Sequence, residues 1–213
     1  MKKSTVIITS ILTLFSGISY SQDKESNTNT LSGFDGLQWG TYYNEAKEKF
    51  RIIASGGDAS DPVNIISDSP GSQFRVQRRS LVYRYEFYQK PEILVKKDTE
   101  SKVDTNGKNA ETGGRFFLVE SRFPYVPAEE LAEKISGKYG ARNGGSLDDK
   151  TNRGYYLWDI DKGYIIQIID PYKKKPFSRN IYYLSKEIIE EIRTDYPRFQ
   201  YSPEIKTIMN ILY

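Results

Sequence analysis

The chain has 213 residues, of which 31 are Lys or Arg and 28 are Asp or Glu, and it contains neither His nor Cys. Without these two residue types it lacks the usual general base at neutral pH, the thiolate nucleophile and the commonest zinc ligands, which excludes Ser–His–Asp triads, zinc hydrolysis and thiol redox chemistry. A formal net charge of +3 also differs from that of dedicated nucleic-acid binders, which carry a clear basic excess. We therefore expect no nucleic-acid partner, no cofactor and no metal site.

The first 21 residues have the charge order of a secretory signal peptide. Lys2 and Lys3 precede an uncharged, mostly apolar run over residues 5–18, and small residues then lead to a cleavage point between Ser21 and Gln22. After this segment no apolar run approaches the roughly 20 residues that a membrane helix needs. We therefore expect a mature protein in the periplasm or secreted, with no transmembrane span.

The mature chain is predicted to begin with a flexible leader. Residues 22–33 are rich in Ser, Asn, Thr and charged residues and contain almost no apolar side chain, so they cannot repay the entropy of ordering. The folded part is expected to begin at Phe34 and to form one domain over residues 34–213. Because the chain has no Cys, a hydrophobic core rather than disulfides must stabilise that domain.

Four helices are expected, because apolar residues recur at helical spacing between capping and helix-breaking residues. The first has Thr41 as its N-cap, and the last places the C-terminus against the body of the domain. The expected limits are Thr41 to Gly56, Pro127 to Gly140, Ser185 to Pro197, and Ser202 to the C-terminus.

Strands are expected where β-branched and aromatic residues alternate with polar ones. The clearest are Ser80–Tyr88, Arg115–Phe123, Arg153–Ile160, Gly163–Ile169 and Arg179–Leu184. The polar stretch 96–114 is expected to be a long exposed loop. Helices and strands follow one another without βαβ alternation, which predicts an α+β fold: one antiparallel sheet with helices packed on one face. The pairs Trp39-Gly40 and Tyr139-Gly140 further suggest a degenerate internal repeat.

Tyrosine and arginine provide the candidate binding residues. The chain has 17 tyrosines, many of them in predicted strands, and Tyr combines apolar area with a hydroxyl group, as protein interfaces require. A basic cluster adjoins them and would meet an anionic envelope polymer, a lipid head group or an acidic partner. The alternative explanation for the tyrosines is ordinary sheet packing. For the arginines, and for the basic run Lys173–Lys175 that could act with them, it is a solvated loop or strand edge. The candidate binding residues are Arg75, Arg78, Arg79, Arg84, Tyr83, Tyr85 and Tyr88.

Carboxylate chemistry is a weaker alternative. Glu129, Glu130 and Glu133 would supply paired acids for sugar hydrolysis, but their spacing places them on the polar face of a helix. The stretch that contains Asp104 fails the pattern of a calcium-binding loop. No catalytic residues are predicted.

The opening Phe34-x-Gly36-x-x-Trp39-Gly40-Thr41, with the later Lys138-Tyr139-Gly140 and a strand that contains Trp158, resembles small exported bacterial domains of mostly unassigned function. In overall style the chain is similar to exported proteins of spirochaetes. The resemblance covers about residues 34–185, rests on short structural motifs and implies no catalytic residues. Spirochaete flagella lie in the periplasm and recruit exported accessory proteins, so the resemblance implies a role beside a periplasmic flagellar filament as one alternative.

The sequence thus predicts an exported, non-catalytic interaction or structural module that binds a protein partner in the cell envelope. The main alternative is a small-ligand or glycan binder with a groove between helix and sheet, and an enzyme is the third. An exposed aromatic patch would favour assembly with a partner, whereas a closed pocket with converging polar groups would favour a ligand. The sequence does not fix the oligomeric state.

Overall fold

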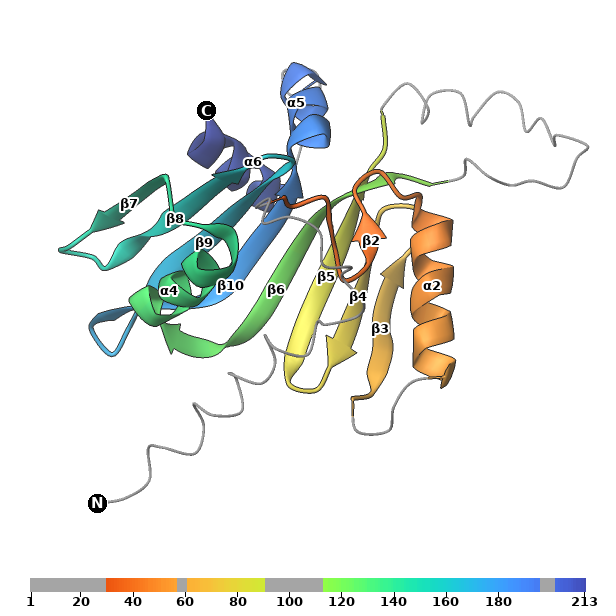
Figure 1. Ribbon diagram of the computed structural model, residues 1–213, viewed down its shortest axis with the longest axis horizontal. Helices are drawn as coiled ribbons and strands as arrows, with labels where there is room; N and C mark the ends of the chain where they lie inside the picture. Colours follow the sequence, from red (N-terminus) through yellow and green to blue (C-terminus); the bar gives the residue numbers. More distant parts are fainter. Residues whose placement is uncertain (1–29, 57–60, 91–112, 196–201) are drawn as a thin grey trace, which may run out of the picture.

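The computed structural model describes residues 30–56, 61–90, 113–195 and 202–213, and its centre is an eight-stranded antiparallel sheet (Figure 1). The predicted signal peptide, residues 22–29 of the leader and most of the predicted loop 96–114 lie outside the described residues. The strands are β3 (Val63–Ser69), β4 (Gln73–Arg78), β5 (Leu81–Tyr88), β6 (Arg115–Pro127), β7 (Gly144–Asp148), β8 (Arg153–Ile160), β9 (Gly163–Tyr172) and β10 (Lys175–Ser185).

The strand order is the same pattern when followed from either edge of the sheet. It runs β3-β4-β5-β6-β10-β9-β8-β7, so two four-stranded meanders meet where β6 pairs with β10. A helix precedes each meander, α2 (Tyr43–Gly56) before β3 and α4 (Ala128–Tyr139) before β7. The dipeptides that suggested a repeat do not hold equivalent places, since Trp39-Gly40 precedes α2 whereas Tyr139-Gly140 ends α4. A repeat in the sequence stays a prediction.

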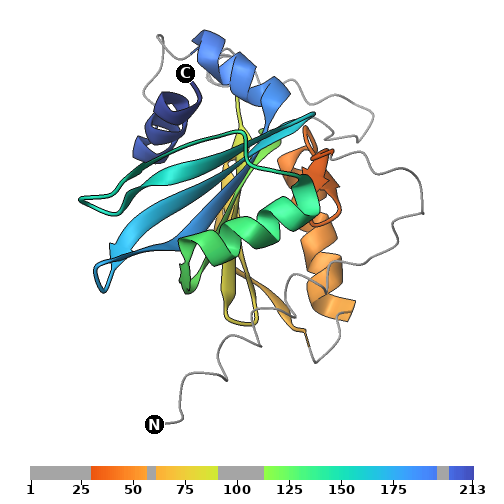
Figure 2. The same ribbon diagram turned by 60° about the vertical axis from the view of Figure 1, so that its left-hand side comes forward.

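The α+β fold with an antiparallel sheet is confirmed, but the helices cover both faces of the sheet (Figure 2). The first face carries α2 and α4, and the second carries α5 (Lys186–Asp195) and α6 (Pro203–Leu212). Successive residues of a strand point to opposite faces. Ile165 and Ile166 are both fully buried, so the central strand β9 is apolar on both faces, and both must be covered. The expectation of helices on one face is therefore wrong.

The core of the first face is aromatic and includes a residue that was expected in the leader. Trp158 is 1% exposed, and the partly buried Trp39 packs on Phe116 with ring centroids 4.8 Å apart. The Trp39 indole N–H donates to the carbonyl of Leu31 at 2.6 Å, and Leu31 is 3% exposed. The folded part therefore begins before Phe34, because the one apolar side chain of this polar stretch is buried in the core.

The caps of the last two helices are confirmed. Ser185 Oγ accepts a hydrogen bond from the backbone N–H of Ile188 at 3.4 Å, and Ser202 Oγ accepts one from Ile205 at 3.3 Å. Thr41 is not a cap, because its hydroxyl donates back to the carbonyl of Gln38 at 2.8 Å and α2 begins two residues later. None of the helices in the described ranges is both long and apolar enough to cross a membrane.

Candidate functional site

The four predicted arginines do not form one surface. Arg78 lies at the end of β4, where its Nε donates to Asp61 at 2.7 Å and its Nη1 lies 3.5 Å from an oxygen of Asp35. Arg79 follows in the tight turn to β5, with a left-handed φ of 55°, and its Nε lies 3.0 Å from Asp61. Both guanidinium groups are therefore engaged with acids that come from other segments of the chain.

Asp35 connects this cluster to the aromatic core. It lies in the turn between two short strands, β1 (Gly33–Phe34) and β2 (Leu37–Gln38), and it accepts a hydrogen bond from the Tyr85 hydroxyl at 3.4 Å. Burial raises the pKa of Asp35 despite the opposing field of Arg78. The cluster of Asp35, Asp61 and Arg78 thus closes one end of the core.

Arg84 is nearly buried on the second face. Its Nε lies 3.1 Å from Glu86 and 3.1 Å from Glu120, and its Nη1 lies 3.9 Å from Glu204 at the start of α6. The exposed fraction of the side chain is 13% for Arg84 and 5% for Glu120. Arg84 therefore links β5, β6 and α6 and has little surface left for a partner.

Arg75 lies directly opposite Arg84 in the β4–β5 pairing and differs from it. Its side chain is exposed and makes no ion pair with any residue that the structure describes. Of the four predicted arginines, Arg75 is thus the one whose side chain a partner would reach without breaking an internal ion pair.

The three predicted tyrosines are core residues. Tyr83 and Tyr85 pack in the first core, where burial raises the pKa of Tyr83 to about 12. Tyr88 is buried on the second face, and its hydroxyl donates to Asp195 at 2.6 Å. Because alternate residues face opposite sides, Arg84 cannot share a surface with Tyr83 and Tyr85. The predicted combination of arginines around a tyrosine centre is therefore wrong as a description of one surface.

A different group of aromatic and basic residues is exposed at the turn between β9 and β10, at the lower left of Figure 1. Lys173 and Lys174 form this two-residue turn, with left-handed φ values of 52° and 60°. All residues from Pro171 to Lys175 are exposed. We name this group the hairpin tip patch; its members are Tyr125, Tyr172, Lys173, Lys174, Lys175, Phe177 and Arg179.

The rings of the hairpin tip patch are ordered by stacking. Tyr125 and Tyr172 are nearly parallel, 7° apart in orientation with centroids 4.4 Å apart, and each is 37% exposed. Phe177 supports both rings at a steep angle, 5.3 Å from Tyr172 and 6.5 Å from Tyr125. The Arg179 guanidinium lies over Tyr125 at 5.2 Å, and the Lys173 ammonium lies over Tyr172 at 5.3 Å. Since the inner ring faces touch each other, these cations occupy the outer faces.

The cations of the hairpin tip patch lack acidic partners. Within the part of the chain that the structure describes, none of Lys173, Lys174, Lys175 and Arg179 makes an ion pair with a carboxylate. The strand arginines Arg78 and Arg84 each contact at least two acids. The hairpin tip patch therefore offers rigid aromatic area and uncompensated positive charge on one exposed surface.

The sequence indicated only part of this patch. The run Lys173–Lys175 was identified as basic, with a solvated loop as its alternative explanation. Tyr172 and Phe177 lie on the two sides of the turn, which is a usable signal for a hairpin with aromatic ends. Tyr125 comes from β6, and only the pairing of β6 with β10 places it beside Tyr172.

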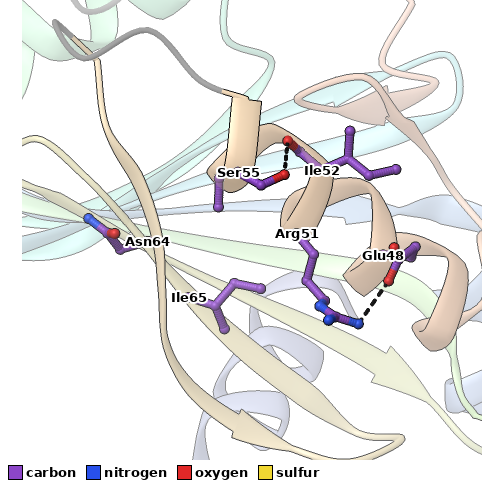
Figure 3. Close-up of a pocket in the computed structure, with 7 residues that line it drawn as sticks. Glu48, Arg51, Ile52, Ser55, Asn64 and Ile65 are labelled. Carbon is purple, nitrogen blue, oxygen red and sulfur yellow. Dashed lines mark hydrogen bonds and ion pairs between the residues drawn. The ribbon is translucent and has the colours of Figure 1, made fainter.

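A hollow of about 470 Å³ lies between α2 and β3 (Figure 3). Ile65 points from β3 toward the helix, whereas Asn64 points away from it. The polar groups of the helix are satisfied within the helix: Arg51 pairs with Glu48 at 3.1 Å, and the Ser55 hydroxyl donates to the carbonyl of Ile52 at 3.0 Å. This hollow is open and its polar groups do not converge on a ligand position.

Two of the three helix acids considered for sugar hydrolysis are engaged in ion pairs. Glu129 accepts a hydrogen bond from Arg142 at 3.0 Å, and Glu130 accepts one from Lys134 at 2.7 Å. A hydrogen bond from Tyr156, with a smaller contribution from Arg142, lowers the pKa of Glu129. A general acid for glycoside cleavage needs a raised pKa, so the environment of Glu129 is of the wrong kind.

Neither a family model, nor a curated protein, nor a solved structure matches the chain. The assignment of a site therefore depends on the geometry above.

Proposed function

We propose that the mature protein is an exported, non-catalytic interaction module that binds a protein partner in the cell envelope through the hairpin tip patch. The observation that carries this proposal is the exposed stack of Tyr125 and Tyr172 with a cation on each outer face, where neither cation makes an ion pair with a residue that the structure describes. Aromatic residues and Arg are the side chains that contribute most to the energy of protein interfaces. The charge order of residues 1–21 supports export.

The setting of the hairpin tip patch favours binding because its geometry is fixed before a partner arrives. Tyr172, Phe177 and Arg179 lie on two paired strands or at their ends, and Tyr125 lies on the adjacent strand. A surface that is already ordered loses little side-chain entropy when it binds. The site therefore has the rigidity that an assembly surface needs.

The alternatives have less support from the geometry. The open hollow between α2 and β3 is the place where a groove binder would take a small ligand, and the charged and hydroxyl groups that α2 contributes to it are engaged within the helix. The buried carboxyls with raised pKa values, Asp35 and Glu86, contact Tyr85 and the arginines that join segments of the fold. These contacts hold segments of the fold together, so the burial of the two carboxyls and their raised pKa values need no catalytic role.

A pair of matched variants tests the proposal. The tip variant carries Lys173→Asn, Lys174→Asn and Arg179→Gln, and the control variant carries three neutralised cations elsewhere, Lys138→Gln, Lys162→Gln and Lys206→Gln. Asn tolerates the left-handed backbone of the turn, so the tip variant keeps its fold. Affinity purification from native envelope should recover a protein partner with wild type and with the control variant, and lose it with the tip variant. Equal recovery with all three proteins would contradict the proposal.

A further inference from the structure

We infer that the hairpin tip patch binds an extended acidic segment of its partner, with Asp or Glu side chains directed at the cations that sandwich the tyrosine rings. This inference rests on the proposed function and deepens it by naming the chemistry of the partner. The observation behind it is the layered order of cation, ring, ring and cation in Arg179, Tyr125, Tyr172 and Lys173.

The occupied ring faces select against a neutral sugar. Carbohydrates dock on aromatic residues by stacking on a free ring face. In the hairpin tip patch, the inner faces of Tyr125 and Tyr172 contact each other and the outer faces carry Arg179 and Lys173. What the surface presents outward is therefore the cations and the ring edges with their hydroxyls, which suits an anion.

The donor groups of the patch match carboxylates. Arg179 offers a planar fork of N–H donors that fits a carboxylate with two parallel hydrogen bonds, and the lysines add point charges. The hydroxyls of Tyr125 and Tyr172 make no hydrogen bond with any residue in the described ranges, so they are further donors. Cation–π contact also holds Arg179 and Lys173 in place, which lowers the entropy lost when an anion binds.

The spacing of the cations favours a chain over a membrane plane. Lys173 and Lys174 lie at the end of the hairpin, whereas Arg179 lies four residues past Lys175 along β10, roughly 13 Å at the rise of a strand. A flat lipid surface would contact Lys173 and Lys174 at the end of the hairpin, and Arg179 would be too far from it to contribute. An extended peptide that runs along the hairpin would reach both, with acids on every second residue facing the patch.

Binding of synthetic probes to the mature protein tests the inference. A fluorescent peptide of alternating Glu and Ser should bind wild type and the control variant, and should weaken by at least about tenfold in the tip variant. Its binding should also weaken as salt is raised, because the contacts are exposed ion pairs. The matched peptide of alternating Gln and Ser should not bind. Equal binding of the Glu–Ser peptide by wild type and tip variant would overturn the inference.

Two further probes identify the other anion classes. Heparin represents anionic polysaccharides, and phosphatidylglycerol vesicles represent anionic lipid. If either binds through the tip patch while the Glu–Ser peptide does not, the acidic-segment inference is overturned. That result differs from failure of the proposed function, in which recovery of the envelope partner would be the same for wild type and tip variant.

Discussion

Two basic regions of this chain look alike in sequence and behave oppositely in the structure. Two arginines of β4 and β5 reach acids from other segments of the chain, as Arg78 does with Asp35 and Asp61, and Arg84 does with Glu120 and Glu204. The cations at the β9–β10 turn have no such partners among the described residues. The fold therefore neutralises these two arginines of one basic region and leaves the cations of the other without ion pairs among the described residues.

Arg84 provides the largest test of this comparison. Arg84→Ala leaves three acids around a buried gap, and removal of one partner from a buried ion pair costs about 3–5 kcal/mol of unfolding free energy. Arg75→Ala is the matched control, since Arg75 lies opposite on the same face without an ion pair, and it should change stability by less than about 0.5 kcal/mol. Urea denaturation measures both. Similar losses of stability for the two variants would show that the ion pairs of Arg84 do not stabilise the fold.

Reversing the charge of Arg78, Arg79 and Arg84 together would not be a clean test of the predicted arginine surface. With Arg84 nearly buried among acids, such a variant would lose stability as well, so loss of binding would not identify a binding surface.

Arg78 provides a smaller effect of the same kind. Arg78→Ala leaves Asp35 and Asp61 without their shared cation, and because the Arg78 side chain is 29% exposed, solvent reduces the cost to about 1–2 kcal/mol. Lys175→Ala at the tip should cost almost nothing by the same measurement. A larger loss of unfolding free energy for Lys175→Ala than for Arg78→Ala would contradict the claim that the strand arginines, and not the tip cations, stabilise the fold.

The sequence predicted most of the fold where the periodic signal is local. The limits of β8 match residue by residue, and the serine caps of α5 and α6 are where the spacing placed them. β3 and β4 were missed because polar and charged residues fill the positions that face away from the core. The short β1–β2 hairpin was also missed. Its sequence signal is the pair Asp35-Gly36, which favours the left-handed backbone that both residues adopt in this two-residue turn.

The proposed binding surface was harder to predict than the fold because it depends on strand register and on charge balance. Nothing local to Arg84 shows that Glu120 and Glu204 will surround it, since these residues come from β6 and α6. In the same way Tyr125 joins Tyr172 across strands that are distant in sequence. Sequence patterns locate strands, but pairing decides which charges are neutralised.

Glu204 should give acid-dependent stability of smaller size. A hydrogen bond from its own backbone N–H, a second from the Ser202 hydroxyl and the field of Arg84 lower the pKa of this carboxyl below its ordinary 4.5. A carboxyl whose pKa is lower in the folded than in the unfolded protein stabilises the fold at any pH above its unfolded-state pKa. This stabilisation is lost as the pH falls through the folded-state pKa. Glu204→Gln should thus be less stable than wild type at pH 7 by under about 1 kcal/mol, with the difference vanishing in acid. A difference that grew in acid would contradict this reasoning.

The smallest change in stability is expected at the tip itself. Lys173→Asn and Lys174→Asn place a residue that favours left-handed backbone at both turn positions, and they remove like charges from one exposed turn. Stability should stay the same or rise by up to about 0.5 kcal/mol in thermal or urea unfolding. A clear loss would show that these lysines have internal partners.

Site-specific photo-cross-linking in native envelope tests the central claim most directly, that the uncompensated tip and not the arginine-bearing sheet contacts the partner. A photoreactive side chain is placed at Lys175 on the tip or at Arg75 on the second face, both of which are exposed strand positions. The account predicts a protein adduct from position 175 and none from position 75. An adduct from position 75 with none from position 175 would contradict it.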